Sequence, residues 1–351
     1  MKKIAAFLER KNIVFSAKRY GVDAMGAMAQ GLFCSLLIGT ILNTLGTQLG
    51  IEFFGTLGGY ASAMSGPAMA IAIGYALKCP PLVLFSLTAV GSAANGLGGA
   101  GGPLAVLIIA IVAAEAGKAV AGETKVDLLV TPLVTIFVGV ALAALCAPAI
   151  GKAASALGSI IMWATELQPF LMGIVVSVII GIALTLPISS AAICAALSLT
   201  GLAGGAALAG CCAQMVGFAV MSFYENRWGG LVSQGIGTSM LQMGNIVKKP
   251  VIWLPTIITS AITGPIATCV FGLKMNGAAI SSGMGTCGMV GPIGVYTGWV
   301  NDIAAGTKAA ITAMDWIGLI LVAIILPAVI CQLISLAFRK AGWIKPGDLK
   351  L

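Results

Sequence analysis

The stretch VDLLVTPLVTIFVGVALAALCAPAI, residues 126–150, decides the fold class of this chain. It is apolar almost throughout, and Asp127 is its one charged residue. The run is longer than the roughly 20 apolar residues that an α-helix needs to cross a bilayer. Similar apolar runs lie on both sides of it, separated by short charged islands. The sequence therefore predicts an all-α, polytopic membrane protein.

The composition of the whole chain supports this prediction. Of its 351 residues, 59% are hydrophobic and only 9% are charged, and the mean hydropathy is +1.06. A soluble domain carries about 25% charged residues because it must cover its surface with them. The 47 glycines suit close helix packing in lipid and broken helices that line a cavity. An ordinary soluble protein is thereby excluded.

The positive charges gather at the two ends of the chain, which carries a net charge of +8. This pattern follows the positive-inside rule, so we expect both termini in the cytoplasm and an even number of spans. It does not indicate nucleic-acid binding. Residues 1–25 lack the order of a signal peptide and are interpreted as an amphipathic arm on the inner leaflet. The basic clusters are Lys2, Lys3, Arg10, Lys11, Lys18 and Arg19 at the start and Arg339, Lys340, Lys345 and Lys350 at the end.

Roughly eight to ten spans are expected, with two or three further segments that enter and leave on one side. Two polar, broken segments, 185–190 and 237–246, interrupt the apolar pattern of the second half. Such segments are the best indication of a transport site in a membrane protein, and the alternative is helix packing by small residues alone. The expected apolar runs are 26–45, 65–77, 81–94, 104–114, 126–150, 170–186, 206–223, 251–273 and 316–338, with a charged turn over 115–127 and a small-residue helix ending near Leu202.

The stretch SSGMGTCGMVGPIGVYTGW, residues 281–299, contains G-x-G-x-x-G at Gly283, Gly285 and Gly288. A dinucleotide site needs a preceding buried strand, a following helix and an acidic residue about 20 positions on. Asp302 meets the last condition, but the preceding run 251–273 is long enough to span a membrane. We therefore expect irregular or tightly packed backbone beside the solute, and no nucleotide cofactor.

The sequence gives little indication of a metal-binding site or a catalytic site. The chain has no histidine, and its nine cysteines form no C-x-x-C, so a Cys/His zinc site is impossible. The cysteines are interpreted as small hydrophobes in helices. An enzyme active in the membrane, using Cys211, Cys212 or a carboxylate, is the least favoured alternative because nothing stands at metal or triad spacing. We predict no metal, no cofactor and no self-contained catalytic site.

Several motifs resemble the EIIC subunits of the sugar phosphotransferase system, of the fructose type. Residues 237–255, GTSMLQMGNIVKKPVIWLP, resemble the family's G-T-S-x-I-T-E-G-A-I-P-F and its later P-L-R-V-I-P. Residues 181–193, GIALTLPISSAAI, resemble its D-M-G-G-P-V-N-K-A-A. The stretches 65–77, 98–118 and 128–140 continue the resemblance in order, so it covers most of residues 64 to 300. Within the family, the chain looks most similar to the group typified by the perfringolysin regulator, whose members are described as permeases and as toxin regulators.

The resemblance implies an organisation as well as an activity. It implies a homodimer in the bacterial plasma membrane that works as an elevator-type transporter with a separate EIIB phosphocarrier. With the residue pattern, it predicts a cytoplasmic arm over 1–25, a scaffold half over 26–151 and an amphipathic interfacial connector over 152–168. A transport half with two re-entrant hairpins follows over 169–339, and a cytoplasmic tail over 340–351.

The chain also departs from the family pattern. Met243 stands where the family has a glutamate and Gln242 where it has a threonine, and the histidine expected near Asn276 is missing. The aspartate and lysine of the first motif are missing too. These residues normally hydrogen-bond the sugar and assist phosphoryl transfer. The sequence thus leaves three functions open: a phosphotransferase permease, a transporter that does not phosphorylate, and a membrane sensor that lost transport.

The candidate solute-binding side chains are neutral hydroxyls and amides, which can both donate hydrogen bonds to a sugar-like solute and accept them. None of them is a base, so phosphorylation would depend on the EIIB partner. Gln214, inside a predicted span, either faces the solute or ties two helices together. The candidates are Ser189 and Ser190 on the first hairpin, Thr238, Ser239, Gln242 and Asn245 on the second, and Ser281, Ser282 and Thr286 in the glycine-rich stretch.

Overall fold

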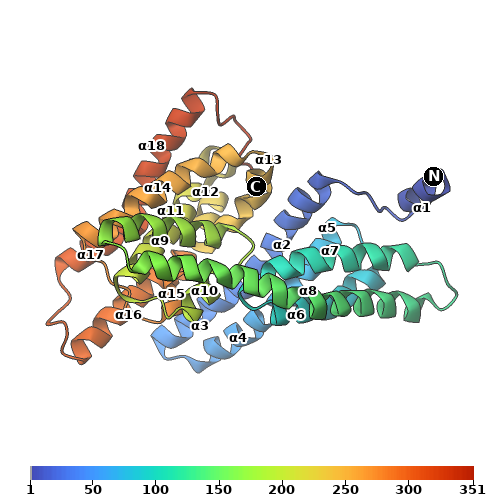
Figure 1. Ribbon diagram of the computed structural model, residues 1–351, viewed down its shortest axis with the longest axis horizontal. Helices are drawn as coiled ribbons and strands as arrows, with labels where there is room; N and C mark the ends of the chain where they lie inside the picture. The colour runs from blue at the N-terminus through green and yellow to red at the C-terminus, as the bar shows by residue number, and fades with distance from the viewer. Residues whose placement is uncertain (1) are drawn as a thin grey trace. The chain divides into compact units, whose positions relative to one another are not determined.

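The computed structural model describes residues 2–351, and helices joined by turns account for them (Figure 1). The described residues contain no strand, only an isolated antiparallel bridge between Gly201 and Met275. The predicted all-α class is therefore confirmed. The chain divides into two compact units, one ending at Ala154 and the other comprising Ser155–Leu351.

Helices of the first unit pack through glycines. A methyl group added at Gly66 of α5 would lie 2.3 Å from the carbonyl oxygen of Gly91 in α6, so the two backbones touch. α6 and α7 form an antiparallel hairpin that turns at Gly99, whose φ is +51°, and Gly117 near the end of α7 packs on Val83 near the start of α6. The elements are α1 Lys2–Arg10, η1 Arg19–Asp23, α2 Ala24–Leu32, η2 Phe33–Leu37, α3 Ile38–Leu49, α4 Glu52–Ala63, α5 Ser65–Ala76, α6 Pro81–Gly98, η3 Gly99–Gly101, α7 Gly102–Val120 and α8 Asp127–Thr165.

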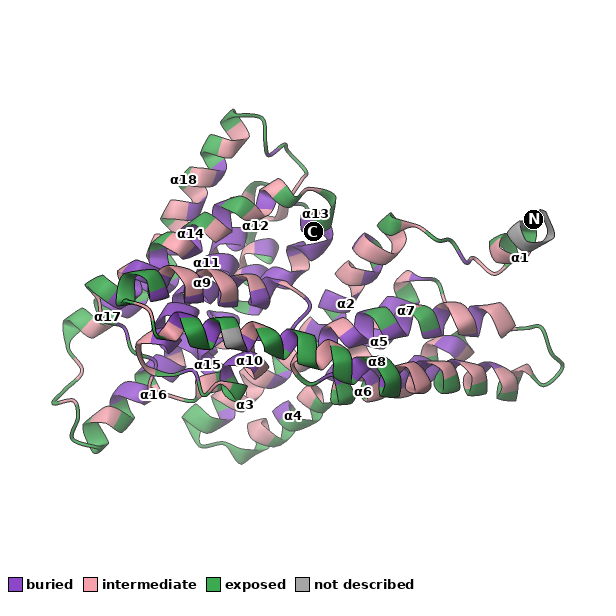
Figure 2. Cartoon of the chain, viewed as in Figure 1, coloured by how far each residue is buried: buried purple, intermediate pink, exposed green. Residues whose placement is uncertain are grey.

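The second unit is built around α11, which is buried along nearly its whole length (Figure 2). Its small residues let α9 and α14 approach closely, as the small-residue pattern predicts. The elements are α9 Pro169–Thr185, α10 Ser190–Ala196, α11 Gly201–Met221, α12 Phe223–Val232, η4 Ser233–Gly237, η5 Ser239–Gln242, α13 Met243–Lys248, η6 Pro250–Trp253, α14 Leu254–Pro265, η7 Ile266–Val270, α15 Ala279–Ser282, η8 Cys287–Met289, α16 Val290–Ala304, α17 Ala313–Ile320, η9 Leu321–Ile325 and α18 Leu326–Lys340.

Six stretches of the described chain are long and apolar enough to cross a membrane, and α9 is a shorter apolar helix. This number is lower than the eight to ten spans expected. Part of the difference is that Pro81–Val120 counts as one stretch although it holds both α6 and α7. The six are Arg19–Leu49, Pro81–Val120, Asp127–Thr165, Gly201–Met221, Pro250–Val270 and Ala313–Lys340.

Two expected helix boundaries were wrong. The connector expected over 152–168 stays a prediction, and most of it belongs to α8, which continues without interruption to Thr165. α7 extends to Val120, through part of the charged island expected to form a turn, because Glu115 and Lys118 pair on one face of the helix with N–O at 2.7 Å. The small-residue helix expected to reach about Leu202 ends at Ala196, before a turn with Ser198 at φ +50°. The roles of the five predicted segments stay predictions.

Candidate functional site

All nine predicted solute-binding residues lie in the second unit, where the structure gathers them in two groups. The first group lies where α10 packs against α15, and the second lies on η5 and α13. Both groups follow breaks in the helical pattern. Pro187 separates α9 from α10, as predicted, and three short elements replace a spanning helix between Ser233 and Lys248.

In the first group, serine hydroxyls hold the backbone of neighbouring segments. Ser189 caps α10, where its Oγ accepts from the N–H of Ala192 at 3.1 Å. Ser190 Oγ donates to the carbonyl oxygen of Gly283 at 2.7 Å, and Ser282 Oγ donates to that of Leu199 at 2.7 Å. These bonds tie α10 to the glycine-rich stretch.

The glycines of that stretch serve close packing. A methyl group on Gly283 would lie 2.6 Å from the carbonyl oxygen of Ser190, and one on Gly285 would lie 2.8 Å from Cys211. Thr286 is buried and donates to the carbonyl oxygen of Gly235, while Ser281 is buried beside Gly294. The stretch thus forms tightly packed backbone against α10, α11 and η4.

In the second group, every polar side chain has a partner within the unit. Thr238 caps η5 by accepting from the N–H of Met240 at 3.2 Å, and Ser239 bonds to Thr185 with oxygens 2.8 Å apart. The amide nitrogen of Gln242 donates to Oε1 of Gln234 at 2.9 Å, and its oxygen accepts from Asn245 at 2.8 Å. Buried amides need such bonds, since an unpaired one is costly.

Gln214 ties helices together. Its Oε1 accepts from Trp253 Nε1 at 2.9 Å, from Thr256 Oγ1 at 2.9 Å and from Thr185 Oγ1 at 3.2 Å. Its amide nitrogen donates to Ser260 Oγ at 3.4 Å. Because Gln214 is fully buried, this hub on α11 joins α9, η6 and α14 through polar bonds in an apolar interior.

The end of the chain covers the second group. We call residues 345–351 the C-terminal tail. Gln242 and Asn226 both donate to the carbonyl oxygen of Leu349, at 2.9 and 2.7 Å, and Asn245 donates to that of Lys350 at 2.9 Å. The Leu349 side chain is fully buried. The amides predicted to bind solute therefore bind peptide groups of the tail in this structure.

The pKa of Asp348 predicts how the tail responds to acid. Burial raises this pKa, but hydrogen bonds from Lys249 Nζ, at 2.6 Å, and from the N–H of Lys345 outweigh burial and hold it below its usual 3.8. A depressed pKa in the bound state stabilises the contact above the ordinary pKa and loses that contribution as pH falls through the lower value. Hydrogen exchange at the tail, corrected for the intrinsic rate, should stay constant from pH 8 to 5 and rise only below about pH 4. Asp348→Asn should raise it between pH 8 and 5 and approach wild type once the wild-type carboxyl is protonated, whereas release near pH 6 would contradict this assignment.

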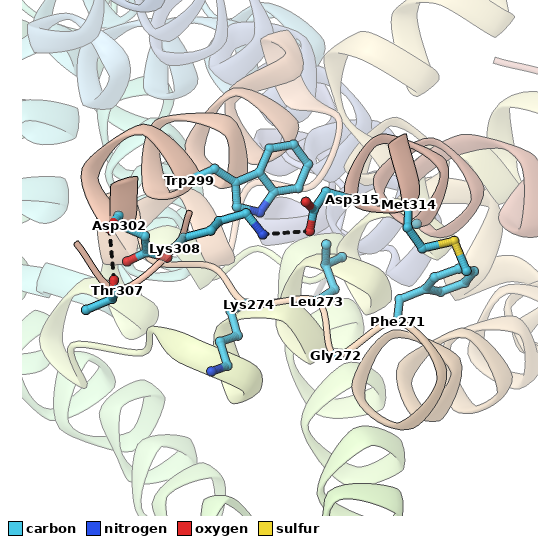
Figure 3. A pocket seen from close by; sticks show the side chains of 11 residues that line it. Phe271, Gly272, Leu273, Lys274, Trp299, Asp302, Thr307, Lys308, Met314 and Asp315 are labelled. Carbon is cyan, nitrogen blue, oxygen red and sulfur yellow. Dashed lines mark hydrogen bonds and ion pairs between the residues drawn. The ribbon is translucent and has the colours of Figure 1, made fainter. Parts of the chain in front are cut away.

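A charged pocket in the same unit carries residues that sequence reasoning missed (Figure 3). Its volume is about 240 Å³. Lys308 pairs with Asp315 at 2.9 Å, Asn276 donates to Asp302 at 2.7 Å, and Trp299 forms an apolar wall. These residues come from α16, from α17 and from the loops before and after α16, so no single motif in the sequence predicts the pocket. The pocket is lined by Phe271, Gly272, Leu273, Lys274, Trp299, Asp302, Thr307, Lys308, Met314, Asp315 and Gly318.

The pocket is suited to a polar ligand. Asp315 is held in place by a capping box with Thr312, whose N–H and hydroxyl donate to it at 2.7 and 2.8 Å. Lys274 is exposed and extends away from the other side chains (Figure 3). In the described part of the chain, no three His, Cys, Asp or Glu side chains are arranged to hold a metal ion.

Comparison with known proteins assigns the chain to a family. No curated protein and no solved structure matches it. A family model described as "Phosphotransferase system, EIIC" matches residues 22–351, which is nearly the whole chain. With the apolar spanning helices and the paired broken segments, this match confirms the resemblance noted from the motifs. The protein belongs to the EIIC family of membrane permeases of the phosphotransferase system.

Proposed function

We propose that this protein carries a small polar solute, a sugar or a sugar-like compound, across the bacterial plasma membrane. One observation carries the proposal: a member of the EIIC family concentrates buried amides and hydroxyls on two broken helical segments. In a membrane protein, polar groups on broken helices are expensive unless they serve each other or a solute. Ser190, Gln242 and Asn245 are placed on these segments.

The proposed site binds its solute through neutral groups. Gln242 and Asn245 offer a donor and an acceptor each, which suits hydroxyl groups. Neither can act as a base, so phosphoryl transfer would come from a separate EIIB protein. We also propose that the protein is a homodimer and that its second half moves as an elevator. A variant of the proposal is transport without phosphorylation, because Met243 replaces the glutamate of the family motif.

A membrane sensor is the second candidate function. The observation that favours it is the C-terminal tail, whose peptide groups take the hydrogen bonds of Gln242 and Asn245. A sensor would bind solute at these amides, release the tail and move nothing across the membrane. The two functions therefore differ in flux, not in binding.

Replacing both amides tests the proposed site. In Gln242→Ala/Asn245→Ala we expect the affinity for a solute to fall at least about tenfold, because two hydrogen bonds of about 1 kcal/mol each are lost. Binding is measured by the thermal stability of the purified protein against a panel of hexoses and hexitols. Counterflow of the labelled hit in proteoliposomes then measures transport.

Asn301→Ala is the matched control, because this amide is exposed on α16 and makes no side-chain hydrogen bond among the described residues. Normal binding by the double variant would refute the site. Binding without counterflow would favour the sensor. Phosphorylated product that appears only with an added EIIB protein and phosphoryl donor would identify a phosphotransferase permease.

A further inference from the structure

A second pocket lies in the first unit, where three segments meet. Its volume is about 460 Å³. The segments are the residues after α1, the turn between α5 and α6, and the region from the end of α7 into the loop before α8. The residues that line it are Arg10, Lys11, Asn12, Lys78, Cys79, Pro80, Lys118, Ala121, Gly122 and Glu123.

The lining is strongly positive. Arg10, Lys11, Lys78 and Lys118 face one carboxylate, that of Glu123. Glu115, which pairs with Lys118, adds one negative charge behind the lining. Arg19 adds a further positive charge, since its guanidinium donates only to the neutral oxygens of Asn12 and Leu77. Asp127, which accepts from the N–H of the lining residue Gly122 at 2.6 Å, adds a third carboxylate, so five cations stand against three carboxylates.

Two of these cations hold the pocket together. Lys118 is buried, and its Nζ pairs with Glu115 at 2.7 Å and donates to the carbonyl oxygens of Asn12 and Leu77 at 2.9 and 3.3 Å. This lysine fixes the segment after α1 to the α5–α6 turn. Lys11 pairs with Glu123 and donates to the carbonyl oxygen of Ala121, which fixes the same segment to the loop after α7.

The other two cations are available to a ligand. Lys78 is exposed at a turn position with φ +56°. Its side chain has no hydrogen-bond or ion-pair partner in the described chain. The side chain of Arg10 is 62% exposed, and among the described residues its guanidinium hydrogen-bonds to Glu123 alone, through Nη2. The pocket therefore presents one unpaired cation, Lys78, beside the exposed guanidinium of Arg10, which is paired with Glu123 through one nitrogen.

We propose that this pocket binds a phosphate group, and that a phospholipid headgroup supplies it. A guanidinium beside ammonium groups matches the several oxygens of a phosphate better than those of a single carboxylate. Basic pockets on the cytoplasmic side of membrane helices recognise anionic headgroups in this way. Exposed apolar side chains lie near the cations in the sequence: Val14 and Phe15 follow Arg10, and Tyr75 precedes Lys78. They offer a surface to acyl chains, which a free phosphate would not need.

The test compares lipids and phosphate on the full-length protein. Wild type in nanodiscs of phosphatidylcholine, with or without phosphatidylglycerol, is examined by thermal unfolding and by native mass spectrometry of retained lipid. We expect phosphatidylglycerol to be retained and to raise the melting temperature. Arg10→Gln/Lys78→Gln should weaken retention about fivefold for each cation removed. Both side chains are exposed, so this variant should fold normally.

Lys125→Gln is the matched control, an exposed loop lysine outside the lining that should behave as wild type. Inorganic phosphate in phosphatidylcholine nanodiscs, compared with chloride at equal ionic strength, distinguishes the source. If phosphate alone stabilises wild type as much as the lipid does, and the double variant loses the effect, the site takes a soluble phosphate compound. Retention and stability that are equal in wild type and the double variant would overturn the proposal.

Discussion

Gly210→Ala is expected to lower the stability of the second unit by about 3 kcal/mol or to prevent its folding. The added methyl carbon would lie 1.9 Å from the backbone carbonyl oxygen of Ser177, which is far closer than two non-bonded heavy atoms can approach. α9 and α11 would have to separate. Ser177 Oγ also donates to the carbonyl oxygen of Ser260 at 2.8 Å, which links α9 to α14. Thermal unfolding and size-exclusion profiles of the purified variant measure the loss.

Gly229→Ala provides the control in the same unit. Gly229 is exposed, and a methyl group there would meet no atom within 4 Å, so its melting temperature should stay near that of wild type. Equal melting temperatures for Gly210→Ala and wild type would show that α9 and α11 do not pack as closely as described.

Gln214→Leu is expected to cost about 1–3 kcal/mol of stability, although leucine fills nearly the same space. The variant keeps the packing of α11 but removes the acceptor of Trp253 Nε1 at a half-buried position. Thr256 loses less, because its hydroxyl also donates to the carbonyl oxygen of Trp253 at 2.9 Å. The melting temperature and the tryptophan fluorescence report the effect, and a Trp253→Phe variant identifies which part of the fluorescence comes from Trp253.

Gln332→Leu is the matched amide control on α18. Oε1 of Gln332 is buried and accepts no hydrogen bond from the described chain, so losing it should leave stability unchanged or raise it. Gln214→Glu, which keeps an acceptor oxygen at the hub, should recover part of the loss when it is protonated. If both leucine variants melt alike, the hub contributes nothing beyond volume.

Much of the fold could be predicted from local sequence signals. Hydropathy predicted the all-α membrane class, and Pro187 predicted the break between α9 and α10. The sequence did not show that one helix runs from Asp127 through Pro148 and residue 152 to Thr165. A proline does not end a membrane helix when its surroundings satisfy the freed backbone groups.

The candidate site was predictable in part. The sequence pointed to Ser190 and Gln242 as polar groups on broken segments, but their partners are the backbone oxygens of Gly283 and Leu349. Every residue has a backbone carbonyl, so the sequence does not indicate which carbonyl accepts these hydrogen bonds. Gln214 was left undecided for the same reason: a buried amide can bind a solute or a neighbouring helix, and only the positions of its neighbours decide.

The sequence by itself determined that this protein lies in a membrane, that it is helical and which family it belongs to, because hydropathy and motif spacing are local properties of the chain. Only the tertiary structure decided that the C-terminal tail covers Gln242 and Asn245, and that Lys308 and Asp315 share a pocket with Asp302. It also decided that the cations around Lys78 meet in one place. These arrangements join segments far apart in the chain, and their energy depends on distances of a few ångströms that residue order does not encode.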